Sequence, residues 1–156
     1  MLIAVISRIP ELYANRRLQA AARERGADVH FIDPLAPFKQ GIAESLDAVI
    51  PRFGPIWQSQ GGAVLAQMQA CGAICLNTPE AVALARDKPA ALQVFAGLQL
   101  PMPSSIPGTA VRDASALAQL PFPFPMLIKE DASAGGWGIH RVEDAAAALA
   151  VIARLN

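Results

Sequence analysis

The chain has 156 residues, of which 53% are hydrophobic, so it can bury a sizeable core and disorder is not expected. Thirteen basic and thirteen acidic side chains cancel, and this balance argues against nucleic acid or an anionic membrane surface as a partner. No apolar run reaches the roughly 18 residues of a membrane span, and the first residues lack the pattern of a signal peptide, so we expect a cytoplasmic protein.

Residues 1–100 alternate short apolar runs with amphipathic stretches. Strands are predicted at residues 2–6, 29–32, 48–50 and 74–76, and helices at about residues 12–25 and 62–70. This alternation is typical of βαβ units, so we expect an α/β domain with an open parallel, Rossmann-like sheet. Ligands bind such sheets beyond the carboxyl ends of the strands, where Arg8 and Arg52 follow the first and third strands. No glycine fingerprint follows the first strand, which disfavours a dinucleotide site.

The two cysteines lie close together at the predicted junction between a helix and a strand. A zinc site needs more ligands than Cys71 and Cys75, and neither His30 nor His140 stands at a ligand spacing from them. We therefore predict no metal site and expect both cysteines to be small buried apolar side chains. His140, in a predicted strand, is expected to be partly exposed rather than catalytic.

The pattern changes after residue 77. One helix is predicted over residues 79–96, followed by a linker that contains Pro101 and Pro103, because two prolines so close together do not fit a helix interior. The rest is predicted as strands at residues 104–110, 124–129 and 138–142 and helices at 113–119 and 144–155, the first of them capped by Asp113. Residues 1–100 and 101–156 are thus expected to form two domains, the second a small α+β unit.

A lysine precedes a glycine-rich loop near the end of the chain. Lys129 ends a predicted strand and is followed, after a few residues, by Gly135-Gly136-Trp137-Gly138. Backbone N–H groups and a lysine can together meet the charge of phosphates, and glycine lets the main chain come close to them. The lysine comes before the glycines, so this is not a P-loop. Taken alone, the pattern fits a phosphate clasp or an ordinary hairpin with a glycine turn.

An upstream motif bears on this choice. The chain reads Leu76-Asn77-Thr78-Pro79-Glu80-Ala81-Val82-Ala83-Leu84-Ala85-Arg86-Asp87-Lys88. This stretch resembles the L-N-x-P-x-A-I-x-x-x-x-D-K motif that introduces the nucleotide-binding region of the ATP-grasp superfamily. The closest likeness is to the RimK-type ligases, which attach glutamate to a protein tail. It spans essentially the whole chain and includes Pro51-Arg52-Phe53-Gly54 and Lys129 with its loop.

The resemblance implies roles for particular residues. Residues 1–100 would be the pre-ATP-grasp domain, and residues 101–156 an incomplete ATP-grasp small (lid) subdomain. Two lysines, Lys88 and Lys129, would contact the phosphates of ATP, and a loop would close over them that consists of Ser133, Gly135, Gly136, Trp137 and Gly138. Arg8 and Arg52 are candidates for a substrate carboxylate, with a surface or interdomain ion pair as an equal alternative.

Several parts of the family pattern have no counterpart in these 156 residues. They are the hinge strand that binds adenine, the large ATP-grasp subdomain and the residues that hold magnesium. The expected cofactor is therefore ATP, with Mg²⁺ held by residues not present in this chain. We expect that the chain alone is not a competent ligase, and no catalytic residue is assigned. The expected partners are ATP, an amino-acid or peptide substrate, and a second copy or a complementary C-terminal half; the alternative function is a non-catalytic interaction or oligomerisation module.

Overall fold

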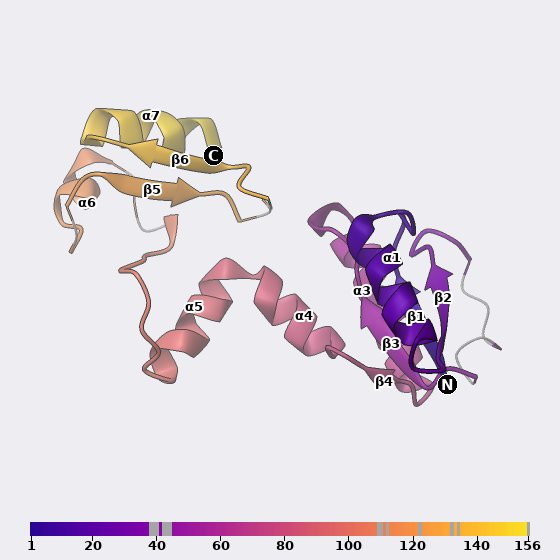
Figure 1. The fold of residues 1–156 in the computed structure, drawn as a ribbon. Coiled ribbons are helices and arrows are strands. Elements are labelled where there is room, and N and C mark those ends of the chain that lie inside the picture. Colours follow the sequence, from indigo (N-terminus) through magenta and orange to yellow (C-terminus); the bar gives the residue numbers. More distant parts are fainter. Residues whose placement is uncertain are drawn as a thin grey trace. The chain divides into compact units, whose positions relative to one another are not determined.

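The structure is a computed structural model that describes residues 1–37, 41, 45–108, 111, 113–121, 123–131, 133 and 135–155. It divides into two compact units, Met1–Ala85 and Arg86–Asn156, whose elements are shown in Figure 1. Each unit has a hydrophobic core of its own. Within the described residues, none of the helices combines the length and the apolar character needed to cross a membrane.

The first unit is built on a parallel sheet. Its strands are β1 (Leu2–Ile6), β2 (Asp28–Ile32), β3 (Ala48–Pro51) and β4 (Ile74–Cys75), in the order β2-β1-β3-β4. The register pairs Ile6 with both Ile32 and Pro51, so the carboxyl ends of the three longer strands meet at one edge. The predicted α/β fold with an open parallel sheet is confirmed.

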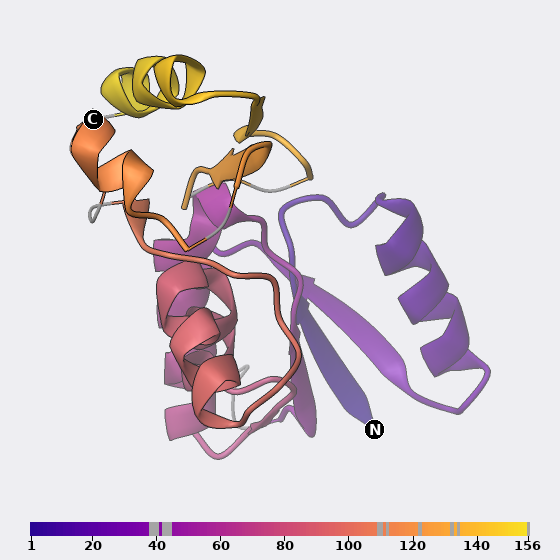
Figure 2. The same cartoon turned by 90° about the vertical axis from the view of Figure 1, so that its left-hand side faces the viewer.

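Helices cover both faces of this sheet. Helix α1 (Tyr13–Arg23) lies on one face, and the short helix η1 (Pro55–Trp57) leads into α3 (Gln58–Ala70) on the other (Figures 1 and 2). Because side chains alternate along a strand, Ala4 and Ile6 point to the face that packs against Leu65 and Met68 of α3. All four of these side chains are fully buried, and so is Val5 on the opposite face, which explains why the strand is a continuous apolar run.

The cysteines lie at the junction of α3 and β4, as predicted, but the expected burial is wrong for Cys71 and only partly met by Cys75. Helix α3 ends at Ala70 and the chain turns at Gly72, where φ is +91°, so Cys71 lies beyond the buried stripe and is exposed. Cys75 on β4 is half-buried, and burial raises the pKa of its thiol, with the charge of Glu80 as the second cause.

This difference predicts unequal reactivity of the two thiols. Because the thiolate is the nucleophile and burial disfavours it at Cys75, Cys71 should be alkylated about tenfold faster near neutral pH. The rate for Cys75 should keep rising towards higher pH, since its raised pKa delays the formation of the thiolate. Iodoacetamide kinetics on the single variants Cys71→Ser and Cys75→Ser check this, and equal rates at about pH 7.5 would contradict it.

The predicted single helix over residues 79–96 is wrong, because the chain forms two helices there. Helix α4 (Pro79–Arg86) ends before Asp87, and α5 (Lys88–Gly97) begins directly after it. The Asp87 carboxylate caps α5 by accepting a hydrogen bond from the Ala90 N–H at 2.9 Å. Pro89 provides no N–H to bond back to a preceding helical turn, and proline is well suited to the first turn of a helix, so a new helix starts here. Lys88 therefore stands in the first turn of α5.

The second unit is built around a hairpin. Its elements after α5 are α6 (Ala114–Ala118), β5 (Met126–Lys129), β6 (Ile139–Val142) and α7 (Ala145–Leu155), which covers one face of the hairpin (Figure 1). The predicted cap of α6 is confirmed, because Asp113 accepts from the Ala116 N–H at 2.9 Å. The predicted strand at residues 104–110 is wrong over its described part, where residues 104–107 are irregular; residues 109 and 110 lie outside the described residues.

The two faces of the hairpin differ in their surroundings. The strands are antiparallel, with Leu127 opposite Arg141 and Lys129 opposite Ile139. Met126, Ile128 and Val142 pack into the core under α7. The alternate residues are exposed, and these are Leu127, Lys129, Ile139 and Arg141. The lysine of the glycine-loop motif thus lies on the outer face of the hairpin, beside apolar surface.

Candidate functional site

The structure brings Lys88 against the loop that follows Lys129. The Lys88 ammonium donates hydrogen bonds to the backbone carbonyl oxygens of Glu130, at 2.8 Å, and Asp131, with a third, longer contact to Ser133 at 3.4 Å. The first two carbonyls are 42 and 43 residues away in the sequence. Two motifs that are far apart along the chain, the one ending at Lys88 and the one beginning at Lys129, therefore meet at one place in the second unit.

The base of this loop is also held from within. The Glu130 N–H donates to the Gly138 carbonyl at 2.8 Å, and the Ser133 hydroxyl donates to the Glu130 carbonyl at 2.7 Å. Gly138 has φ +69°, and a Cβ there would lie 2.8 Å from both the Glu130 Cδ and the Ser133 Cβ. Glycine is therefore required at this position for two independent reasons, its backbone conformation and the space around it.

A row of side-chain hydrogen bonds joins the loop to α7. His140 Nε2 lies 3.0 Å from Glu130 Oε1, and His140 Nδ1 lies 3.3 Å from an Arg154 side-chain nitrogen. Arginine can only donate, so Nδ1 accepts and the neutral imidazole carries its proton on Nε2, which donates to Glu130. The prediction of a partly exposed strand histidine is confirmed, since the His140 side chain is 25% exposed.

Sequence reasoning missed the part that Glu130 plays here. Its backbone and side chain together contact Lys88, Ser133, Gly138 and His140. The signal for the last contact was the strand register: once Lys129 pairs with Ile139, residue 130 faces the other strand diagonally from His140. The sequence pattern located both strands but not the pairing between them.

Lys129 and the glycines present groups that can bind an anion. Among the residues that the structure describes, no side chain or carbonyl pairs with the Lys129 ammonium, which is exposed at the end of β5. Gly135, Gly136 and Gly138 have φ values of +67°, +85° and +69°, a backbone conformation that favours glycine. Trp137 between them is 82% exposed and so is not covered by the sheet. An unpaired ammonium beside such a glycine-rich backbone suits phosphate groups.

The other predicted residues lie in the first unit, at the carboxyl edge of its sheet. Arg8 Nε is 3.5 Å from Asp33 Oδ2, and the Arg8 guanidinium lies 4.7 Å from the centre of the Trp57 ring. An ion pair, one of the two alternatives for Arg8, is therefore present. Arg52 is exposed beyond β3, and its backbone N–H donates to the Ile6 carbonyl at 3.0 Å.

A buried asparagine that the sequence analysis did not single out supports the turn carrying Arg8. Asn15 on α1 is fully buried, and its amide nitrogen donates to the Ser7 hydroxyl at 2.9 Å and to the Ile9 carbonyl at 2.8 Å. A polar residue in a buried position of an amphipathic helix was the available signal. Asn15 thereby holds the backbone on both sides of Arg8.

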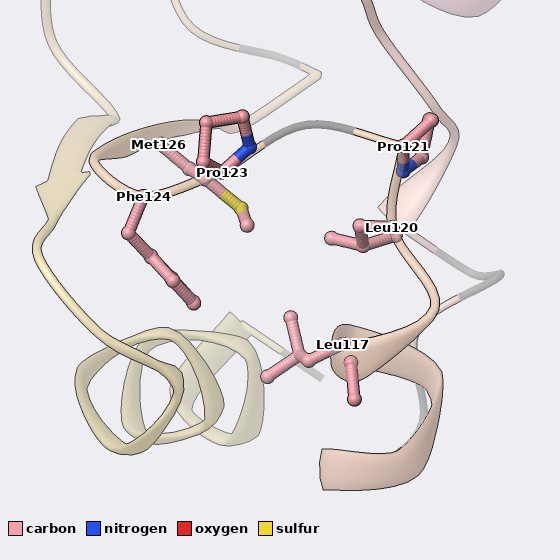
Figure 3. Close-up of a pocket in the computed structure, with 7 residues that line it drawn as sticks. Leu117, Leu120, Pro121, Pro123, Phe124 and Met126 are labelled. Carbon is pink, nitrogen blue, oxygen red and sulfur yellow. The ribbon is translucent and has the colours of Figure 1, made fainter.

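A separate, shallow and open depression lined by apolar side chains lies between α6 and β5. It measures about 430 Å³ and is lined by Leu117, Ala118, Leu120, Pro121, Pro123, Phe124 and Met126 (Figure 3). None of these side chains is charged, so the depression offers nothing to neutralise a phosphate. Within the described part of the chain, no group of three or more His, Cys, Asp or Glu side chains is arranged to hold a metal ion. The loop after Lys129 is therefore the candidate site for an anionic ligand.

Comparisons with known proteins agree on one family. A family model for the RimK pre-ATP-grasp domain matches residues 1–38. Over the whole of this chain, probable alpha-L-glutamate ligases from Xanthomonas oryzae pv. oryzae and Xanthomonas campestris pv. campestris are 34% identical, and one from Stenotrophomonas maltophilia is 32% identical. The chain covers 57% or 58% of the length of these relatives.

A solved structure extends the similarity to the fold. The crystal structure of a RimK domain ATP-grasp protein from Sphaerobacter thermophilus matches 99% of this chain and 59% of its own chain. The TM-score is 0.69 and the sequence identity is 20%, so this likeness concerns the fold alone.

Proposed function

Because this chain belongs to the RimK-type ATP-grasp family, we propose that it forms the phosphate-binding part of an ATP-dependent ligase that joins glutamate to an amine. The resemblance expected from the sequence motifs is thereby confirmed, and its relatives are named as probable glutamate ligases. The domain assignment stays a proposal: residues 1–100 as the pre-ATP-grasp domain and residues 101–156 as part of the small lid subdomain.

The observation that carries this proposal is the meeting of Lys88 with the loop after Lys129. Lys88 belongs to the motif that resembles the start of the nucleotide-binding region, and its ammonium touches the backbone directly after Lys129. The Lys88 ammonium thus lies against the residue that follows Lys129 in the chain. A polyphosphate carries several charges in a short length, so convergent cations are what its binding requires.

The residues of the loop and Lys88 are proposed to contact different parts of the ATP phosphates. Lys129 and Lys88 neutralise phosphate charge, and the backbone N–H groups around Gly135, Gly136 and Gly138 donate to phosphate oxygens, with Ser133 and Trp137 in the same loop. Ligases of this family generally use ATP with Mg²⁺, which supplies further charge neutralisation when phosphate is transferred. The lysines and the loop contribute positioning of the phosphates, a main source of rate in such reactions.

Arg8 and Arg52 are proposed to bind the carboxylate of the amino-acid or peptide substrate. Both follow strands whose carboxyl ends meet at one edge of the sheet. The Arg8 guanidinium lies over the Trp57 ring, and its Nε atom is 3.5 Å from Asp33 Oδ2. The two terminal nitrogens of Arg8 are the proposed donors of a bidentate contact with a carboxylate.

Lys129→Met tests the proposed phosphate site. Removal of one charged donor should weaken ATP binding roughly tenfold, in line with the 1.5–3 kcal/mol of a hydrogen bond to a charged group. Arg141→Met is the matched control, because it removes a positive charge from the same face of the hairpin, where Arg141 already pairs with Glu143 at 3.0 Å.

Calorimetric titration of ATP into both variants and the unaltered chain gives the answer. Arg141→Met should bind within about twofold of the unaltered chain, since a screened surface charge contributes little. Equal affinities for Lys129→Met and the unaltered chain would overturn the phosphate role of Lys129. Absence of ATP binding by the unaltered chain would favour the alternative of an interaction module.

A further inference from the structure

We propose that Lys88 is a positioning residue that holds the glycine loop in place before any nucleotide binds. The proposal rests on the proposed function only in regarding this loop as the phosphate-binding element. Its physical basis is the set of contacts that the Lys88 ammonium makes with the protein's own backbone.

The geometry accounts for all the donors of Lys88. An ammonium group has three N–H donors, and three carbonyl oxygens lie around it, those of Glu130, Asp131 and Ser133. Lys88 is half-buried, so these charge-assisted contacts are less screened than those of a surface lysine. A lysine whose only purpose is to await phosphate would not be expected to have all its donors engaged by backbone.

The positive charge of Lys88 stabilises the arrangement of the loop carbonyls. Three carbonyl dipoles directed at one point repel one another, and a positive charge at that point turns the repulsion into attraction. Within the loop, the Ser133 hydroxyl supplies one more donor, and it goes to the Glu130 carbonyl. Without Lys88, the carbonyls of Asp131 and Ser133 lose this partner, and the turn loses the charge that brings them together.

We call the contacts of Lys88 with the carbonyls of Glu130, Asp131 and Ser133 the Lys88 clamp. The start of the helix that carries Lys88 is well defined. Lys88 is the first residue of α5, whose start is determined by the Asp87 cap and by Pro89 in the first turn. One of the carbonyls that Lys88 holds belongs to Glu130, the residue directly after Lys129. By holding the Glu130 carbonyl, Lys88 therefore fixes the backbone at the end of β5 and with it the position of Lys129.

The clamp is compatible with a phosphate contact by the same ammonium. The contact with the Ser133 carbonyl, at 3.4 Å, is the longest of the three measured from Lys88. A phosphate oxygen carries charge and is a stronger acceptor than a neutral carbonyl, so it would replace this contact first. The bond to Glu130 would remain, and Lys88 would then link the loop and the nucleotide.

Hydrogen exchange in the absence of nucleotide tests the clamp. In Lys88→Met, the amides of residues 130, 131, 133 and 135–138 should exchange about tenfold faster than in the unaltered chain, because the loop opens more often. Lys129→Met is the matched control and should exchange at the unaltered rate, since the Lys129 side chain makes no hydrogen bond to the loop backbone among the described residues. Lys88→Arg should restore part of the protection, because a guanidinium can also donate to several carbonyls.

The outcomes separate this proposal from the proposed function. If the loop amides of Lys88→Met exchange at the unaltered rate, the proposed clamp is overturned, whatever the affinity for ATP. If Lys129→Met loses ATP binding while its loop amides exchange at the unaltered rate, the phosphate site is affected and the clamp is intact, as the proposal requires. Exchange at β1 and α7 reports whether the variants are folded. If Lys88→Met unfolds, the unaltered chain still decides: the Lys88 ammonium protons should exchange slowly enough to be seen by NMR while those of Lys129 are not, and equally fast exchange at both lysines would overturn the proposal.

Discussion

Gly61→Ala should destabilise the first unit by about 2 kcal/mol, whereas Gly62→Ala, at the next position of the same helix, should stabilise it by about 0.5–1 kcal/mol. A Cβ at position 61 would lie 2.4 Å from the ring of Phe53, which is only 4% exposed and belongs to the core of this unit. The ring cannot move aside without disturbing that core. At position 62, no atom lies within 4 Å of a new Cβ, so only the gain in helix propensity remains.

Urea unfolding checks this pair. Trp57 lies at the start of α3 and reports on the first unit, provided that Trp137 is replaced by Phe in every variant so that the second unit does not contribute. Unfolding midpoints that shift in opposite directions for the two glycine variants would support the packing of Phe53 against α3. A shift of the same sign and size in both would contradict it.

Gly138→Ala should destabilise the second unit by about 2–4 kcal/mol and weaken the proposed ATP binding. The φ of +69° costs an L residue about 1–2 kcal/mol, and the clash with Glu130 and Ser133 adds to this cost. Glu130 cannot easily withdraw, because its carboxylate pairs with His140 and its N–H bonds to the Gly138 carbonyl. The loop after Lys129 would therefore lose its backbone conformation.

Gly136→Ala is the matched control for the loop. Its φ of +85° imposes a backbone cost of the same kind, but nothing lies within 4 Å of a new Cβ. Thermal unfolding of the second unit, monitored by Trp137 in a background without Trp57, should show the larger loss for Gly138→Ala. ATP titration of the same variants should follow the same order, and equal losses at both positions would show that the space beside Gly138 is unimportant.

Local signals predicted most of the elements. Continuous apolar runs located the four strands of the first sheet, and Gly26, with φ +70°, ended the first helix as expected. The aspartate at position 113 capped its helix as predicted. The break at Asp87 was missed although its signal is local, because the apolar spacing of residues 79–96 was given more weight than Pro89.

Other features had no local signal. The exposure of Cys71 depends on where α3 leaves the sheet, and the irregular form of residues 104–107 depends on what surrounds them. A strand needs a neighbour to pair with, and a single sequence does not show which neighbours exist.

The amino-acid sequence by itself determined the periodicities, the cap at Asp113, the alternation of strands and helices, the two lysine-bearing motifs and, through those motifs, the family. These are local properties, because each depends on residues within one or two turns or strands. Only the tertiary structure decided that Lys88 holds the backbone of Glu130, Asp131 and Ser133, and that Glu130 pairs with His140. Such contacts join residues that strand register and helix packing bring together, and the physical reason that the sequence did not reveal them is that many pairings satisfy the same local preferences.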